Sequence, residues 1–172
     1  MCNLSLFSQD LPAPALYVQD SEGVYRPATG DELLKAAQEH LARQIVGRAM
    51  FDSPMAVRDY LRCRHATRGY EVFGVLLLDS QNRLIEAVDM FRGTLSQTSV
   101  YPREVVRLAM NANAAALIAY HNHPSGASTP SRADESLTST LKAALAMMDV
   151  RLLDHFIITA EKVTSMAELG LV

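Results

Sequence analysis

A nearly continuous apolar run at residues 71–78, with the sequence Glu-Val-Phe-Gly-Val-Leu-Leu-Leu, constrains the fold of this chain more than any other feature. A strand with one face in water would alternate apolar and polar residues, and this run does not. It therefore predicts a β-strand that is buried on both faces. A polar turn at residues 79–82 and a second strand at residues 83–90 follow, so we expect the two strands to pair as a hairpin.

The second half of the chain alternates predicted helices and strands. A helix begins at Pro102, a short buried strand spans residues 115–120, and a long helix begins after Ser131. Two further strands are predicted at residues 152–159 and 162–166. A hairpin followed by alternating elements is typical of an α/β domain, in which helices flank a mixed β-sheet.

The N-terminal part of the chain gives a different pattern. Apolar residues on both sides of the polar stretch 20–23 indicate a small hairpin, and a helix is predicted with Asp31 as its cap. A second helix is predicted to begin at Ser53, which caps it ahead of a proline. We therefore predict an N-terminal extension over residues 1–50 and one larger domain over residues 51–172.

Composition argues against several classes of protein. Apolar residues make up 49% and charged residues 20% of the 172 residues, as in an ordinary globular protein. Cys2 and Cys63 are too few for a disulfide framework or a thiolate metal site. No apolar run approaches the length of a membrane span and no signal peptide is visible, so we expect a cytoplasmic protein without membrane contact. The net charge of -3 argues against broad nucleic-acid binding.

The densest concentration of polar chemistry lies between residues 121 and 134. His121 and His123 stand two residues apart in an extended segment, so their imidazoles project to the same side and can converge. Asp134 lies in the first turn of the following helix, close enough along the chain to fold back over them. Two imidazoles and a carboxylate, without thiolates, are typical of a catalytic zinc site with one open coordination position. A water held there would have its pKa lowered to about 7.

Two further residues could complete such a site, which needs a base for the water and a donor for the oxyanion. Ser131 could supply the donor, but its position also predicts a helix cap, and one hydroxyl cannot easily fill both roles. Glu71 is the best candidate for the base, because a carboxylate at the start of a buried strand is otherwise costly. A solvated strand end would explain Glu71 equally well.

The spacing of His121, His123, Ser131 and Asp134 resembles the complete signature of the JAMM, or MPN-plus, metalloproteases. The sequence around it is similar to the RadC-like branch of that family, over about residues 51–172. Further matches to that branch are Gly93-Thr94, Tyr101-Pro102-Arg103-Glu104 and Leu153-Asp154-His155.

This resemblance implies a fold, a form of the protein and a set of roles. The family fold is an α/β JAB/MPN sandwich of the cytidine-deaminase-like kind. Residues 1–50 do not resemble the helix-hairpin-helix segment that usually precedes this domain, so the chain looks like the short, stand-alone members. The resemblance implies zinc ligands at His121, His123 and Asp134, a general base at Glu71 and an oxyanion donor at Ser131.

The pair Asp154-His155 has no role in the signature. We interpret it as a polar pair within a strand, either in the core or in support of a metal ligand, in preference to a second metal site.

These observations lead to one hypothesis and two alternatives. The hypothesis is a zinc-dependent metallohydrolase of the JAMM type, a metallopeptidase that cleaves an amide or isopeptide bond in an unknown protein or peptide substrate. The first alternative is a DNA-repair-associated or DNA-binding module that keeps the metal site. A zinc deaminase is disfavoured, because its chemistry needs H-x-E followed by P-C-x-x-C.

The DNA alternative depends on a cluster of arginines, which we otherwise interpret as a solvated helix face. The cluster comprises Arg58, Arg62, Arg64 and Arg68. The loops expected to select a substrate, residues 91–101 and 124–130, carry no recognisable specificity signal, and the sequence does not indicate an oligomeric state.

Overall fold

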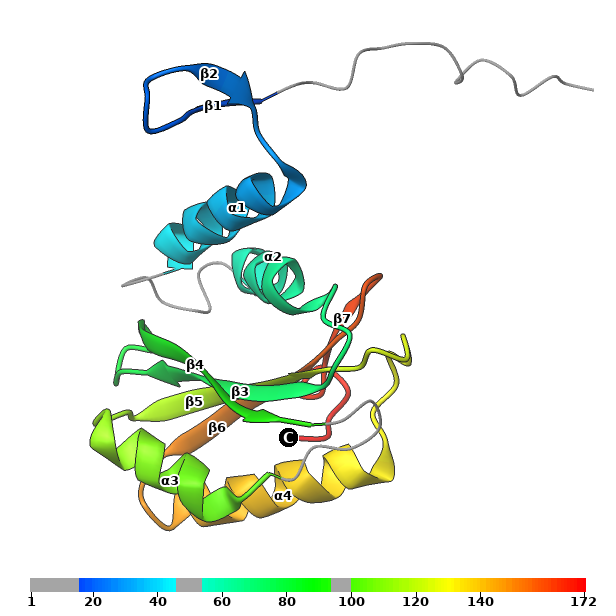
Figure 1. Cartoon of the computed structure of the whole chain (residues 1–172). Coiled ribbons are helices and arrows are strands. Elements are labelled where there is room, and N and C mark those ends of the chain that lie inside the picture. Colours follow the sequence, from blue (N-terminus) through cyan, green and yellow to red (C-terminus); the bar gives the residue numbers. More distant parts are fainter. Residues whose placement is uncertain (1–15, 46–53, 94–99) are drawn as a thin grey trace, which may run out of the picture. The chain divides into compact units, whose positions relative to one another are not determined.

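The described part of the chain forms two compact units. The structure, a computed structural model, describes residues 16–45, 54–93 and 100–172 (Figure 1). Of the described residues, 16–37 belong to one unit and those from 38 onward belong to the other.

The smaller unit begins with the hairpin that the sequence predicts. β1 (Tyr17–Gln19) and β2 (Tyr25–Pro27) pair antiparallel. In the turn between them, the Asp20 carboxylate accepts hydrogen bonds from the backbone amides of Glu22 and Val24, both at 2.9 Å. An aspartate that binds the backbone in this way stabilises the turn without help from a core.

α1 (Gly30–Ile45) begins at a capping box. The Glu32 amide donates to the Thr29 hydroxyl at 3.3 Å, and the Thr29 amide donates to the Glu32 carboxylate at 2.8 Å. The predicted cap, Asp31, is therefore wrong. Thr29 takes its place because a threonine followed three residues later by a glutamate satisfies amides at both positions.

The larger unit is built on a mixed five-stranded sheet in the order β4-β3-β5-β6-β7. β5 and β6 run parallel, and the other neighbouring strands pair antiparallel. The strands are β3 (Val72–Leu78), β4 (Leu84–Arg92), β5 (Ala116–Asn122), β6 (Arg151–Ile158) and β7 (Val163–Ser165). Every residue of β3 and β5 is buried, as the apolar run predicts for β3.

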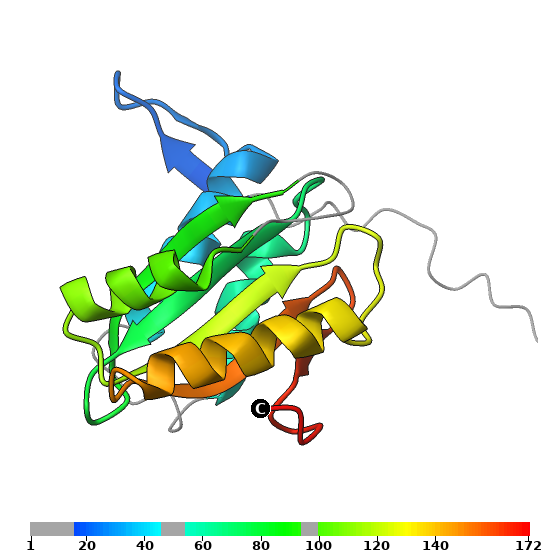
Figure 2. The ribbon, with the colours of Figure 1, turned by 90° about the horizontal axis from the view of Figure 1, so that it is seen from below.

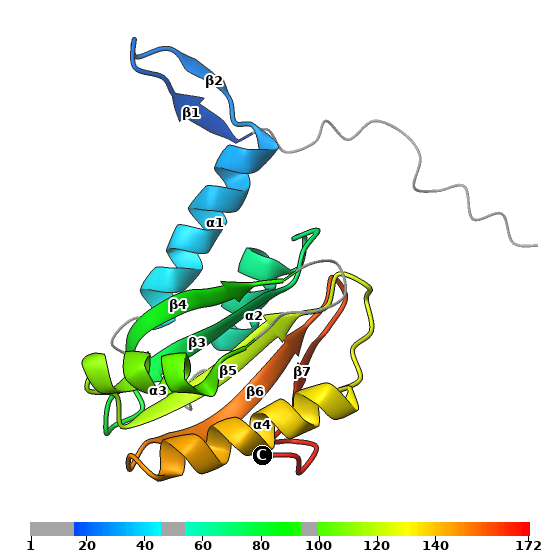
Figure 3. The same cartoon turned by 60° about the horizontal axis from the view of Figure 1, so that its bottom comes forward.

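Helices cover both faces of this sheet (Figures 1 and 2). α2 (Pro54–His65) lies on one face. α3 (Pro102–Asn111) and α4 (Arg132–Ala146) cross the other face, as Figure 3 shows. Within the described ranges, no helix combines the length and the apolar character needed to cross a membrane.

Each face of the sheet has its own apolar core. Leu76 and Leu78 of β3 belong to the core that contains Leu61 of α2. Val75 and Leu77 belong to the core that contains Leu141 of α4. Successive side chains of a strand point to opposite faces, so residues 75–78 of β3 meet apolar neighbours on both faces of the sheet. This is why the run has no polar alternation.

The predicted fold class is confirmed as α/β, with helices flanking a mixed sheet. The order of the helices and strands matches the sequence prediction, and the strand bounds differ by one or two residues. The predicted cap at Ser53 and the predicted division between residues 50 and 51 lie outside the described residues.

Candidate metal centre

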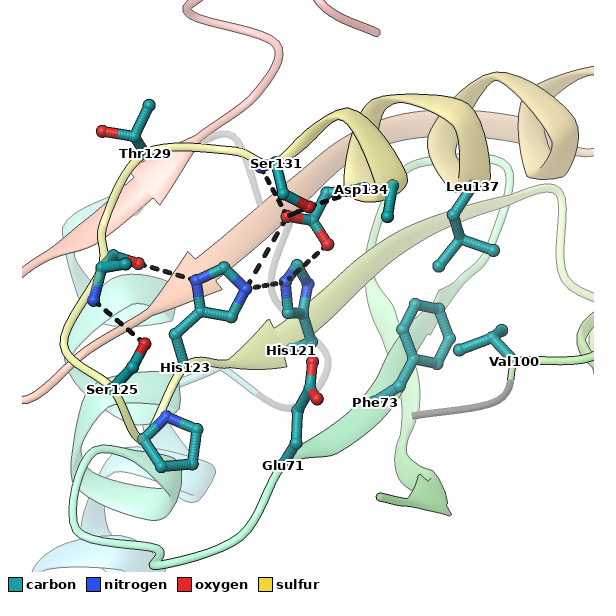
Figure 4. A pocket seen from close by; sticks show the side chains of 13 residues that line it. Glu71, Phe73, Val100, His121, His123, Ser125, Thr129, Ser131, Asp134 and Leu137 are labelled. Carbon is teal, nitrogen blue, oxygen red and sulfur yellow. Dashed lines mark hydrogen bonds and ion pairs between the residues drawn. The ribbon is translucent and has the colours of Figure 1, made fainter. Parts of the chain in front are cut away.

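A pocket of about 580 Å³ opens where β5 ends and α4 begins (Figure 4). β5 and β6 are parallel and α4 connects them, so the end of β5 and the beginning of α4 lie at the same edge of the sheet. Ligand sites in such sheets lie beyond the carboxyl ends of the strands. All five site residues predicted from the sequence line this pocket, namely Glu71, His121, His123, Ser131 and Asp134.

The two histidines converge as their spacing predicts. His121 is a buried residue of β5, and His123 follows the end of the strand. Their Nε2 atoms lie 2.8 Å apart. His123 Nδ1 lies 2.6 Å from the carbonyl oxygen of Ala127. A carbonyl can only accept, so Nδ1 of His123 carries a hydrogen, and in the neutral imidazole Nε2 then presents a lone pair to the pocket.

Asp134 brings a third ligand atom to the same point. Its Oδ1 lies 3.2 Å from His121 Nε2, and its Oδ2 lies 3.7 Å from His123 Nε2. Ser131 holds the carboxylate through a capping box, with its amide and hydroxyl donating to Oδ2 at 2.7 and 2.6 Å.

The charge of Asp134 follows from these contacts. Partial burial raises its pKa, but the contact with the His121 imidazole and the hydrogen bonds from Ser131 outweigh burial. The net pKa of Asp134 lies well below its ordinary value. The carboxylate is therefore ionised at neutral pH, as a metal ligand must be.

Glu71 reaches the pocket from the residue before β3. In Figure 4 its carboxylate lies on the other side of His121 from Asp134. One ligand atom each from Glu71, His121 and His123 lie within 4.8 Å of one another, so these three residues could also hold a metal ion. The pocket thus offers two ligand sets, one with Asp134 and one with Glu71. Among the residues that the structure describes, none hydrogen-bonds to the Glu71 carboxylate, whereas Ser131 fixes that of Asp134.

Ser131 is the N-cap of α4, which is one of the two roles that its position predicts. Its hydroxyl donates to Asp134 Oδ2 and accepts from the Asp134 amide at 3.2 Å. The side chain nevertheless faces the pocket (Figure 4). The oxyanion role stays a prediction.

Behind His121 lies a buried pair of polar residues. His155 Nε2 is 2.8 Å from His121 Nδ1, and His155 Nδ1 is 2.6 Å from Thr138 Oγ1. Burial lowers the pKa of His155 well below its ordinary value, so its imidazole is neutral. The Asp154 carboxylate instead accepts hydrogen bonds from the hydroxyl of Ser165, at the end of β7, and from the backbone amide of Ala167.

Sequence reasoning placed His155 in the core or behind a ligand, and it missed Thr138 entirely. The only signal for Thr138 was a hydroxyl one helical turn after the predicted ligand Asp134. A threonine in the middle of a helix is too common to be informative without the strand that it contacts.

Comparison with known proteins decides the family. The family model described as the RadC-like JAB domain matches residues 51–171, which is well over half of the chain. The chain belongs to the RadC-like JAB family. The matched residues include all five strands of the large sheet and all five predicted site residues of this RadC-like chain.

Relatives of the RadC-like chain are described as UPF0758 proteins. One from Polaromonas sp. is 57% identical over 148 residues, which cover 84% of this chain and 66% of the relative. One from Leptothrix cholodnii is 57% identical over 148 residues, which cover 84% of this chain and 67% of the relative. One from Aromatoleum aromaticum is 56% identical over 150 residues, which cover 87% of this chain and 67% of the relative. The RadC-like chain spans about two thirds of the length of these curated relatives.

Proposed function

We propose that this chain is a zinc-dependent metallohydrolase of the JAMM type, which uses water to cleave an amide bond in a peptide or isopeptide linkage. The observation that carries the proposal is the convergence of two imidazole nitrogens and a carboxylate oxygen. His121 Nε2 lies 2.8 Å from His123 Nε2 and 3.2 Å from Asp134 Oδ1. Electron-pair donors this close repel one another unless a cation or a proton lies between them.

We assign the metal to His121, His123 and Asp134 and leave Glu71 outside the ligand set. The capping box fixes the Asp134 carboxylate with one oxygen toward the histidines. Two nitrogens and one oxygen, without thiolate, form a set that catalytic zinc accepts with a fourth position open. Zinc bound there would polarise a substrate carbonyl and lower the pKa of a water to about 7.

Glu71 acts as the general base in this proposal. Its carboxylate takes a proton from the attacking water, while the water oxygen bonds to the carbonyl carbon of the substrate. The same carboxyl group then donates this proton to the leaving nitrogen as the C–N bond breaks. The products are an acid and an amine, and Glu71 returns to its ionised form.

Ser131 can cap α4 and stabilise the oxyanion in turn. Asp134 Oδ2 accepts two hydrogen bonds from Ser131, one from the amide at 2.7 Å and one from the hydroxyl at 2.6 Å. When substrate binds, the amide can keep holding the carboxylate while the hydroxyl turns toward the developing oxyanion. The two roles therefore do not exclude each other.

An apolar wall suggests the class of substrate. Phe73, Val100 and Leu137 line the pocket beside His121 (Figure 4). Burying an apolar side chain against this wall would favour binding and would orient the adjacent amide. We propose peptides or isopeptides with an apolar residue next to the cleaved bond.

Two isosteric variants separate the ligand from the base. We expect Glu71→Gln to keep about one zinc per chain and to lose at least about 100-fold in cleavage of a fluorogenic peptide library, because a carboxamide cannot accept the proton. We expect Asp134→Asn to lose zinc, because a neutral amide is a poor ligand. Metal analysis by mass spectrometry and library cleavage measure both, with thermal unfolding of each variant as the control for folding.

Two results would contradict the proposal. Zinc retained in Asp134→Asn and lost in Glu71→Gln would make Glu71 the ligand. A zinc-loaded wild-type chain that cleaves no member of a library varied in the apolar residue would refute the hydrolase itself.

A further inference from the structure

Two buried residues behind the site control which nitrogen of His121 faces the pocket. We infer that Thr138 and His155 form a chain of hydrogen bonds with one direction, which fixes the tautomer of His121 before a metal binds. This inference rests on the proposed function, since it concerns a proposed ligand. Both residues are fully buried, with 0% of their surface exposed.

The direction of the chain is set at Thr138. Its Oγ1 lies 2.6 Å from the backbone carbonyl oxygen of Asp134. A carbonyl oxygen has no hydrogen to give, so the hydrogen between these two atoms belongs to the Thr138 hydroxyl. Without it, two oxygens with lone pairs would face each other at 2.6 Å. The hydroxyl therefore donates to Asp134 and not to Met166 Sδ, a weak acceptor 3.6 Å away, and it can only accept from its remaining neighbour.

The other neighbour is His155, whose Nδ1 lies 2.6 Å from Thr138 Oγ1. His155 must donate this hydrogen bond, so its Nδ1 carries the hydrogen. The imidazole of His155 is fully buried, which disfavours its charged form, so it has a single N–H and its Nε2 is an acceptor. That Nε2 faces His121 Nδ1 at 2.8 Å, so His121 donates in turn from Nδ1.

A neutral imidazole has a single N–H, so a neutral His121 that donates from Nδ1 has no hydrogen on its Nε2. This atom lies 2.8 Å from His123 Nε2 and 3.2 Å from Asp134 Oδ1, where the proposed metal needs a lone pair. Hydrogen bonds that ran in the opposite direction would place a hydrogen on His121 Nε2 and would block coordination of the proposed metal by this atom. Thr138 and His155 are thus positioning residues that act through His121.

These hydrogen bonds also connect two of the proposed metal ligands. The chain of hydrogen bonds starts on the backbone of one proposed ligand, Asp134 in α4, passes through His155 in β6, and ends on another ligand, His121 in β5. The packing of α4 against the sheet therefore determines the protonation pattern of a strand residue. Partners of this kind typically change metal affinity by about 10- to 100-fold.

A matched pair of variants tests the role of the hydroxyl. Thr138→Val keeps the branched shape and removes the hydroxyl, and Thr138→Ser keeps the hydroxyl. We expect Thr138→Val to bind zinc at least about 10-fold more weakly than the wild type and Thr138→Ser to stay within about threefold. Competition with a chromophoric chelator measures the affinities. Equal affinities for the two variants would overturn the inference while leaving the hydrolase proposal standing.

Nuclear magnetic resonance of the ¹⁵N-histidine-labelled wild type tests the direction without any variant. Long-range ¹H–¹⁵N spectra should show the hydrogen on Nδ1 of both His155 and His121, with and without zinc. A hydrogen on Nε2 of His155 would overturn the inference, even if Thr138→Val fails to fold. A wild type that binds no zinc would refute the proposed function, and the spectrum of the metal-free protein would still decide the direction of the chain.

Discussion

At the scale of single residues, His65 at the end of α2 shows how burial changes the chemistry of an imidazole. It is fully buried, and neither ring nitrogen has a hydrogen-bond partner among the described residues. Its Nε2 lies 3.5 Å from Asp89 Oδ1, and its ring lies 4.9 Å from that of Tyr120. Burial lowers the pKa of His65 to about 4, Asp89 opposes this shift, and Arg68 and Arg64 reinforce it. The contact with Asp89 is therefore no ion pair at neutral pH.

This shift predicts a loss of stability in mild acid. The unfolded chain takes up a proton at His65 near pH 6.5, whereas the folded chain does so only near pH 4. Between these values acid favours the unfolded state, so the free energy of unfolding falls as the pH falls. We expect His65→Phe to lose less stability than the wild type between about pH 7 and about pH 5. Urea unfolding at both pH values measures this, and equal losses in the two proteins would contradict it.

At the scale of elements, Gly74 allows a side chain of β5 to cross β3. Tyr120 is the cross-strand partner of Gly74, and its hydroxyl donates to Asp89 on β4 at 2.7 Å. A methyl group on residue 74 would lie 2.4 Å from the Tyr120 ring and 2.5 Å from the carbonyl oxygen of Val88. Tyr120 thus connects β5 to β4 across β3, at a position where residue 74 has room only for a hydrogen atom in place of a side chain.

We predict that Gly74→Ala lowers the free energy of unfolding by about 1–3 kcal/mol, because the added methyl group overpacks the crossing. Gly69→Ala is the matched control, since nothing lies within 4 Å of the methyl group that it would add. Chemical unfolding of both variants gives the two values. A Gly74→Ala protein as stable as the control would show that Tyr120 can move aside at no cost.

The elements that could be predicted are those whose signal is local. The apolar run predicted β3 because both of its faces are covered. The spacing of His121 and His123 predicted their convergence because the chain is extended where β5 ends, with His121 in the strand and His123 directly after it. The prediction of Glu71 as a site residue depended on the family resemblance as well, because a solvated strand end would explain this residue equally well. Thr138 could not be predicted, because its contact with His155 exists only after α4 packs on β6.

At the scale of the whole molecule, the arginine cluster of the DNA hypothesis bonds to the protein itself. Its members are Arg58, Arg62, Arg64 and Arg68. Arg58 pairs with Glu168, and Arg62 donates to the carbonyl oxygen of Ala160 at 3.1 Å. Arg64 and Arg68 both pair with Asp89, at 3.4 and 3.2 Å. These contacts use the guanidinium groups that phosphate binding would need.

We therefore predict no saturable binding of duplex DNA at physiological salt. The net charge of -3 gives no overall attraction to phosphates, and the arginine cluster is engaged within the fold. Fluorescence anisotropy of a labelled duplex at micromolar protein measures this. Saturable binding that weakens steeply with salt and is reduced in Arg62→Ala would support the DNA alternative instead.

The central claim is that residues His121, His123 and Asp134 hold one metal ion, and the zinc content of three purified proteins tests it most directly. Ser125→Ala is the matched control for His123→Ala, because Ser125 lies on the same loop and lines the same pocket without offering a ligand of the proposed set. We predict about one zinc per chain in the wild type and in Ser125→Ala, and almost none in His123→Ala. Unchanged zinc content in a folded His123→Ala protein would contradict the claim.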